Sequence, residues 1–204
     1  MEYKTINSSS QGELIQKKSR FIATIVPTKS EQETISIISD IRHKYWDARH
    51  NVYAYILYAE KISRFSDDGE PQGSAGMPVL DVLQREQLFD CIVVVTRYFG
   101  GTLLGTGGLV RAYSGATRLA IDSAKIIIKR LCYEYSMVIE YNLFSAIQIL
   151  LLQIECRITS TDYSDNIKLN ILVPELFEII FLKGVAEITF GKVIPKKTIS
   201  IYSE

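Results

Sequence analysis

The 204-residue sequence predicts an α+β protein with two domains, and three observations support this prediction. A hydrophobic content of 47% with 23% charged residues is typical of a folded chain and too apolar for a disordered one. Nine of the twelve glycines lie between Gly69 and Gly115, so the glycine content changes sharply along the chain. Residues 1–129 contain 16 basic and 14 acidic side chains, whereas residues 130–204 contain 7 and 9. We therefore predict one domain over residues 1–129 and another over residues 130–204.

The first domain should contain three strands and three helices. Ser30 and Glu33 form a capping-box pattern before apolar residues at helical spacing, which indicates the start of an amphipathic helix. Ser74 and nearby acidic residues favour the start of a second helix. The continuous apolar run over residues 92–96 indicates a strand buried on both faces. The predicted strands are residues 20–26, 51–58 and 92–96, and the predicted helices are residues 31–45, 76–86 and 108–123.

The second domain shows the element order βαββαβ, which is typical of the ferredoxin-like fold. Pro174 should begin its second helix, because the missing N–H of proline costs nothing in a first turn. Gly184 should end that helix in a left-handed conformation. The predicted elements are a strand at 131–141, a helix at 142–153, strands at 154–163 and 166–173, a helix at 174–183 and a strand at 186–193.

Charge and cysteine content limit the functional class. A net charge of zero excludes a strongly basic nucleic-acid coat or a polybasic membrane anchor. Cys91, Cys132 and Cys156 are widely spaced and odd in number, so we expect buried free thiols and no zinc site. The N-terminal residues lack an apolar signal segment, and the apolar stretch at 143–154 is too short to cross a bilayer. We expect a cytoplasmic protein that does not bind membranes.

An acidic loop is the first candidate functional segment. Asp67, Asp68 and Glu70 lie within four positions, among glycines. Carboxylates this close repel one another unless a cation, an arginine or backbone N–H groups compensate their charge. The sequence favours a structural role in which these acids hold the loop. A metal-binding or catalytic role and recognition of a partner are the alternatives.

A glycine-rich loop is the second candidate, and it joins the buried strand to the following helix. Glycine allows backbone N–H groups to point inward, and a helix N-terminus attracts negative charge, so the loop can hold an anion such as phosphate. The pattern is neither a dinucleotide fingerprint nor a Walker loop. Close packing of the helix against the sheet is the alternative role. The loop glycines are Gly100, Gly101, Gly105, Gly107 and Gly108.

No conventional catalytic signature accompanies these loops. The sequence has two histidines, of which His43 should lie on the polar face of a helix and His50 should begin a strand beside Asp47 and Arg49. There is no H-x-x-x-H pair and no G-x-S-x-G elbow. We therefore assign no catalytic residue, no metal ligand and no cofactor.

Taken together, these motifs resemble the YigZ/IMPACT family. Family members commonly have lysine where this chain has Met77 and Leu103, so the basic set that remains is Arg20, Arg49, Arg97 and Arg111. The second domain looks like the C-terminal module of the bacterial members, so the resemblance spans nearly the whole chain. The matching stretches are residues 19–23, 47–50, 64–71, 73–76, 93–101 and 104–113.

The resemblance has implications for fold and function. It implies that residues 1–129 adopt a ribosomal protein S five domain 2-like α/β fold, with a left-handed βαβ crossover. It also implies that the two domains look like the fourth and fifth domains of translation elongation factor G, which contact ribosomal RNA. Eukaryotic relatives bind a translation-linked activator of an amino-acid-starvation kinase. We therefore expect a non-enzymatic binding protein that acts in translation or its regulation through RNA, the ribosome or a translation factor.

Two alternatives remain open. One is a phosphate- or nucleotide-binding enzyme that uses Asp67, Asp68, Glu70 and His50, with or without a divalent metal. The other is an adaptor that binds only proteins. We expect ligand binding to be confined to the first domain. The expected binding residues are Arg20, Arg49, His50, Asp67, Asp68, Glu70, Arg97, Tyr98, Gly100, Gly101, Gly105, Thr106, Gly107, Gly108 and Arg111.

Overall fold

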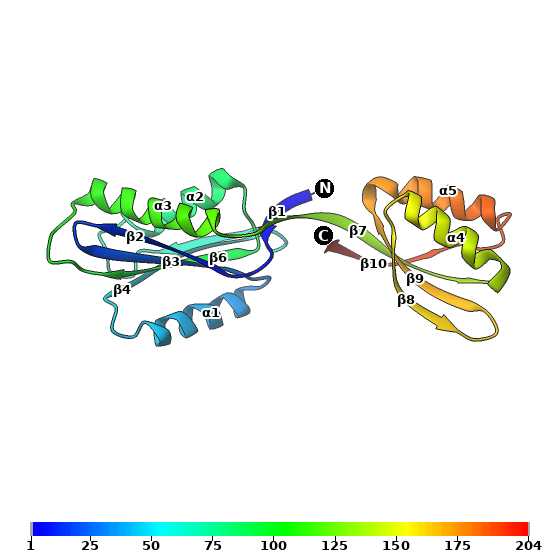
Figure 1. Cartoon of the computed structure of the whole chain (residues 1–204), viewed down its shortest axis with the longest axis horizontal. Coiled ribbons are helices and arrows are strands. Elements are labelled where there is room, and N and C mark those ends of the chain that lie inside the picture. Colours follow the sequence, from blue (N-terminus) through cyan, green and yellow to red (C-terminus); the bar gives the residue numbers. More distant parts are fainter. Residues whose placement is uncertain (1, 204) are drawn as a thin grey trace. The chain divides into compact units, whose positions relative to one another are not determined.

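A computed structural model describes residues 2–203, which divide into two compact units (Figure 1). The first unit is Tyr3–Ile128, and the second unit is Glu2 with residues 129–203. Residues 2–203 form two antiparallel sheets and five α-helices, which agrees with the predicted α+β class. None of these helices combines the length and the apolar composition that a bilayer crossing requires.

The first unit is a five-stranded sheet with helices on both faces. Helices α2 (Gly76–Glu86) and α3 (Thr106–Asp122) pack on one face, and α1 (Glu31–Lys44) packs on the other (Figure 1). The central strand is buried on both faces, as its apolar run predicts. In order across the sheet, the strands are β2 (Ser10–Gln16), β3 (Ser19–Pro27), β6 (Cys91–Tyr98), β4 (His50–Leu57) and β5 (Ile62–Ser66).

The start of α1 confirms half of the predicted capping box. The Ser30 hydroxyl accepts a hydrogen bond from the Glu33 N–H at 3.2 Å. The Glu33 carboxylate, however, accepts from the N–H of Lys29 at 2.8 Å, one residue before the cap. Two backbone donors are therefore satisfied at the helix entry, although the second is not the one that the motif predicts.

Four strands have no counterpart among the predicted elements, namely β1 (Glu2–Ile6), β2, β5 and β10 (Lys196–Ser203). Strands β2 and β5 lie at the two edges of the first sheet and stay largely exposed, so their residues show no continuous buried run. Gly12 in β2 lies directly against α3, where a Cβ would overlap the backbone of Leu119 and Ala120.

The second unit packs two helices on one face of its sheet (Figure 1). Its core joins Ile147 of α4 (Tyr141–Gln153) and Phe181 of α5 (Glu178–Ile188) to the alternating buried residues of β9, such as Leu169. The strands are β7 (Ile126–Ile139), β8 (Arg157–Tyr163), β9 (Ile167–Pro174) and β10 (Lys196–Ser203), in the order β10-β7-β9-β8, with β1 also joined to β7.

The last two elements predicted for this unit, a helix at 174–183 and a strand at 186–193, differ from the structure. Pro174 ends β9 and is followed by a short 3-10 turn, so the helix begins at Glu178 and not at residue 174. Gly184 lies inside α5, where a Cβ would come within 2.6 Å of the Leu150 side chain on α4. The glycine therefore allows two helices to approach closely and does not end one. The strand predicted at 186–193 is wrong, because that segment holds the end of α5 and a turn.

All three cysteines are free and buried, as predicted. Burial raises the pKa of the Cys91 thiol and of the Cys156 thiol to about 12. The thiolate is the nucleophilic form of cysteine, so both side chains are held in their unreactive state at neutral pH.

Candidate functional site

A pocket of about 480 Å³ lies on the first unit, where β4, β6, the acidic loop and the start of α3 meet. The fold brings these segments together because His50 and Arg97 are directly opposite each other on neighbouring strands. We call this the Arg97 pocket. Its walls are Arg49, His50, Gly69, Glu70, Pro71, Arg97, Phe99, Leu103, Leu104, Gly105, Thr106 and Leu109.

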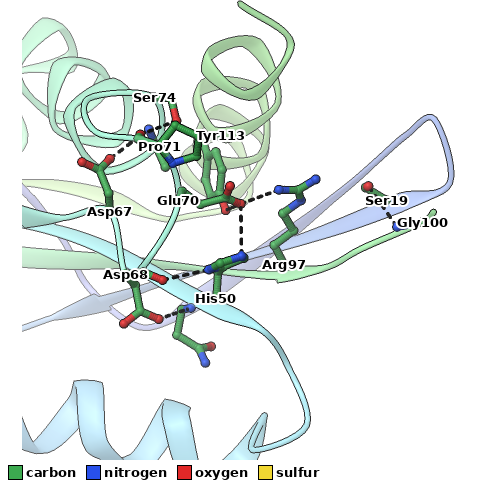
Figure 2. Close-up of polar contacts among 12 residues, drawn as sticks. Ser19, His50, Asp67, Asp68, Glu70, Pro71, Ser74, Arg97, Gly100 and Tyr113 are labelled. Carbon is green, nitrogen blue, oxygen red and sulfur yellow. Dashed lines mark hydrogen bonds and ion pairs between the residues drawn. The ribbon is translucent and has the colours of Figure 1, made fainter. Parts of the chain in front are cut away.

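A buried ion pair lies in the wall of the Arg97 pocket (Figure 2). Arg97 is only 6% exposed, and its Nη1 lies 2.5 Å from Glu70 Oε1. The Tyr113 hydroxyl donates to the same oxygen at 2.7 Å. Burial, together with the neighbouring Glu70 carboxylate, raises the pKa of Tyr113, so the phenol remains a neutral donor. Glu70 thus joins β6 to α3 through two charge-assisted hydrogen bonds.

Arg97 keeps hydrogen-bonding capacity beyond this pair. Its Cζ lies 5.4 Å from the ring centroid of Phe21 and 5.6 Å from that of Phe99, so two aromatic rings flank the guanidinium. Its Nε is buried and has no hydrogen-bond partner within residues 2–203. A buried donor without an acceptor is costly, and an anion in the pocket is one way to supply that acceptor.

His50 has a defined tautomer. Its Nδ1 lies 2.8 Å from the backbone carbonyl oxygen of Asp68, and because a carbonyl only accepts, Nδ1 carries the proton. Its Nε2 faces Glu70 Oε1 at 4.0 Å (Figure 2). The imidazole is therefore oriented by the acidic loop and presents Nε2 toward the ion pair.

Asp67 holds the acidic loop against the first turn of α2 (Figure 2). Its carboxylate accepts from the N–H groups of Gly73 at 2.8 Å, Ala75 at 3.1 Å and Gly76 at 2.8 Å. The predicted role of Ser74 at this helix start is wrong, because its hydroxyl donates to the Pro71 carbonyl at 2.6 Å, whereas an acidic residue, Asp67, does accept from the first helical N–H, as predicted. Asp67 has the structural role that the sequence favours for this loop.

Asp68 also has its carboxylate occupied. It accepts from the Asn51 N–H at 2.6 Å and pairs with Arg42 at 2.6 Å, so it ties the loop to β4 and α1. Of the three loop acids, only Glu70 enters the Arg97 pocket. Within residues 2–203, no group of three or more His, Cys, Asp and Glu side chains is arranged to hold a metal. The structure therefore does not gather the acids on which the enzyme alternative depends.

Replacing Asp67 with alanine should lower the free energy of unfolding by about 1–3 kcal/mol, because three backbone donors lose their acceptor. Urea denaturation of the whole chain measures this loss. Asp67→Asn should cost less, since one oxygen acceptor remains. Asp40→Ala is the matched control, because Asp40 is exposed on α1. Equal losses in Asp67→Ala and Asp40→Ala would contradict the structural role.

The start of α3 forms another wall of the Arg97 pocket. Its N-cap residue, Gly105, has a φ of 71°, and no side chain of the described residues 2–203 caps the helix. Gly105 and Thr106 line the pocket, so the positive end of this 17-residue helix lies at the wall. A helix end without a side-chain cap leaves first-turn N–H groups available to an acceptor.

Other predicted residues lie outside the Arg97 pocket. Arg20 forms a two-bond pair with Glu13 at 2.7 and 2.9 Å, and the Tyr98 hydroxyl donates to Asp47 at 2.8 Å. Arg111 is exposed on α3. The structure therefore places six of the fifteen expected residues in the pocket walls, namely Arg49, His50, Glu70, Arg97, Gly105 and Thr106. The remaining loop glycines, Gly100, Gly101, Gly107 and Gly108, do not line it.

Gly100 packs against the hairpin turn between β2 and β3. Its N–H donates to the Ser19 hydroxyl at 3.1 Å, and a Cβ on it would overlap the backbone of Lys18 and Ser19. This glycine has the close-packing role that was the alternative to anion binding. It also brings the turn residues Lys17 and Lys18, both exposed, beside the strand end that carries Phe99.

Sequence reasoning missed the apolar wall of the Arg97 pocket, which consists of Phe99, Leu103, Leu104 and Leu109. It also missed Lys17 and Lys18. No sequence signal marks these lysines, because a hairpin turn is indicated by residues such as glycine, asparagine or aspartate, and a basic pair is not such a signal.

Comparison with known proteins gives a consistent result. The family model of the Impact N-terminal domain matches residues 17–121. IMPACT family member YvyE of Bacillus subtilis is 34% identical over 191 residues, which cover 93% of this chain and 88% of the relative. YigZ of Escherichia coli is 37% identical over 161 residues, covering 78% of this chain and 79% of the relative. A crystal structure of a hypothetical protein superposes with a TM-score of 0.66 at 31% identity, covering 97% of this chain and 98% of that one. The chain belongs to the IMPACT family.

Proposed function

We propose that this protein is a non-enzymatic, cytoplasmic binding protein that acts in translation or its regulation by contacting RNA, either free or in the ribosome. One observation supports this most strongly: the Arg97 pocket joins a partly unpartnered buried arginine to the uncapped start of α3. Both features favour phosphate oxygens. The pocket contains one carboxylate, already paired, so it lacks the free acid that hydrolytic chemistry needs.

The fold supports the same proposal. The strand order β10-β7-β9-β8 fits a ferredoxin-like second domain. In the first domain, α1 connects β3 to β4 across β6, and this βαβ unit fits the domain 2-like fold of ribosomal protein S five. We propose on this basis that residues 1–129 and 130–204 fold as separate domains, like the fourth and fifth domains of elongation factor G.

The free positive charges around the Arg97 pocket are few. Several arginines are neutralised by ion pairs, for example Arg20 by Glu13 and Arg118 by Glu86. Ten exposed cations of the first unit have no ion pair within residues 2–203, but only four of them lie on segments that line or adjoin the Arg97 pocket, namely Lys17, Lys18, Arg49 and Arg111. With four free cations around the pocket we expect modest affinity and a small salt dependence.

Binding to single-stranded RNA should show a logarithmic salt slope of about −3, the value for about four phosphate contacts. Arg49→Ala should reduce the slope by about 0.7, and the Lys17→Ala, Lys18→Ala double variant by about 1.4, since each contact releases counterions. Fluorescence anisotropy at several salt concentrations measures both values. Arg118→Ala is the control and should leave the slope unchanged, because Glu86 already neutralises Arg118. The proposal would be overturned if the protein bound neither RNA nor ribosomes, or if its affinity for RNA did not change with salt concentration.

A further inference from the structure

The Arg97 pocket has two chemically different sides. Arg97, Arg49 and the start of α3 supply donors for an anion, and we call them the anion side. Phe99 and Leu103, which are 47% and 81% exposed, belong to the apolar lining residues, which we call the apolar side. A metal ion or a bare phosphate needs no apolar wall. The two sides together fit a ligand that carries an anion and a flat apolar group next to each other.

The ring of Phe99 is suited to stacking. The Arg97 guanidinium lies over it at 5.6 Å from the centroid, and the ring still keeps about half of its surface exposed. Nucleic-acid bases stack on such exposed aromatic rings, and cation–π contact from an arginine adds to the interaction. A base of any sequence can use this surface, because every base has a π-face.

The anion side has a small positive charge of its own. Glu70 neutralises Arg97, so the excess comes from Arg49, which has no ion pair within residues 2–203, and from the positive end of α3. The Nε of Arg97 adds a buried donor that has no hydrogen-bond partner within residues 2–203. A single phosphate group matches this charge, whereas a polyphosphate would bring more negative charge than the pocket compensates.

We propose that the Arg97 pocket binds one unpaired nucleotide of a single-stranded RNA segment, with its phosphate at the start of α3 and its base on Phe99. This inference rests on the proposed function and narrows it, because a base within a duplex is already stacked and cannot reach Phe99. The pocket volume of about 480 Å³ lies in the range of small-molecule sites.

The experiment compares AMP, adenosine and inorganic phosphate by calorimetry on the full chain, together with single-stranded and duplex RNA. AMP should bind at least about 10-fold more tightly than adenosine or phosphate, since only AMP uses both sides of the pocket. Single-stranded RNA should bind more tightly than the duplex. AMP and phosphate binding should both weaken in Arg49→Ala.

Phe99→Ala separates the two sides of the Arg97 pocket. AMP binding should weaken about 5- to 100-fold, the range for the loss of one base–aromatic stack, while phosphate binding stays unchanged. Phe99→Trp should retain AMP binding. Leu103→Ala should weaken it as well, and because Leu103 is exposed, this variant keeps the wild-type fold. Phe190→Ala is the matched control, since Phe190 is 87% exposed and belongs to the second unit.

The outcomes distinguish this inference from the proposed function. Phosphate that binds as tightly as AMP would show a simple anion site and overturn the inference. Salt-dependent RNA binding that is unaffected by Phe99→Ala and Leu103→Ala, with no AMP binding, would also overturn it but leave the proposed function intact. Absence of binding to every RNA, to ribosomes and to AMP would overturn both. Capture of an acidic peptide in place of AMP would indicate a protein partner and contradict both.

Discussion

Replacing Glu70 with alanine should lower the free energy of unfolding by about 3–5 kcal/mol. The substitution leaves the Arg97 guanidinium, which lies in a residue only 6% exposed, without its counterion. It also removes the acceptor of the Tyr113 hydroxyl. A buried charge without a partner is among the most destabilising defects in a protein, and this one lies where β6 and α3 are joined. Urea denaturation of the full chain measures the loss.

Two variants show whether the loss comes from the unpaired charge. Removing both charges, with Glu70→Leu and Arg97→Met together, should recover most of the stability, because apolar side chains carry no desolvation cost. Glu13→Ala breaks the exposed pair with Arg20 and should cost no more than about 1 kcal/mol. If Glu70→Ala lowers the free energy of unfolding no more than Glu13→Ala does, the Arg97–Glu70 pair does not stabilise the fold as a buried ion pair should.

Replacing Gly100 with alanine should cost about 3 kcal/mol or more, the upper end for overpacking. The new Cβ would overlap main-chain atoms of Lys18 and Ser19, which cannot rotate away as a flexible side chain can. The β2–β3 turn would have to move, and the hydrogen bond from Gly100 to the Ser19 hydroxyl would break. Thermal unfolding, with hydrogen exchange across residues 10–27, measures both the loss and its location.

Gly107→Ala is the matched control for this prediction. Apart from the helix itself, no atom of the described part of the chain lies within 4 Å of a Cβ at Gly107, and the residue is in the first turn of α3. Alanine favours a helix over glycine, so stability should stay the same or rise by up to about 1 kcal/mol. Similar stabilities of Gly100→Ala and Gly107→Ala would show that the strand end does not pack tightly on the turn.

The sequence predicts elements well where local signals agree. For α1, the cap at Ser30 and the helical spacing of apolar residues indicate the same start, and the structure has it there. The edge strands β2 and β5 have no such signal, because a strand exposed along one face and one edge needs no apolar run. Gly184 misled the prediction because a glycine that ends a helix and one that admits a neighbouring helix are identical in sequence.

The candidate site could be predicted only in its charged half. Glu70 and Arg97 stand out as charged residues near glycine-rich loops, Arg49 stands out beside His50, and the structure gathers all three charged residues in one pocket. Phe99 and Leu103 give no such signal, because an apolar residue in a loop is equally compatible with burial elsewhere. Their place depends on the approach of the α3 entrance to the strand ends, which is a property of the folded sheet. The roles of Asp67 and Asp68 likewise depend on distant backbone groups.

Each of the two units contains at least one buried thiol, which can report when that unit unfolds. Cys91 lies at the start of β6 in the first unit, whereas Cys132 and Cys156 belong to the core of the second. A thiol that is buried, with a pKa near 12, reacts with an alkylating reagent only after the surrounding structure has opened. The order in which these positions become modified under native conditions is therefore a direct ranking of the stabilities of the two halves. The native cysteines can therefore show whether the two units unfold cooperatively or independently.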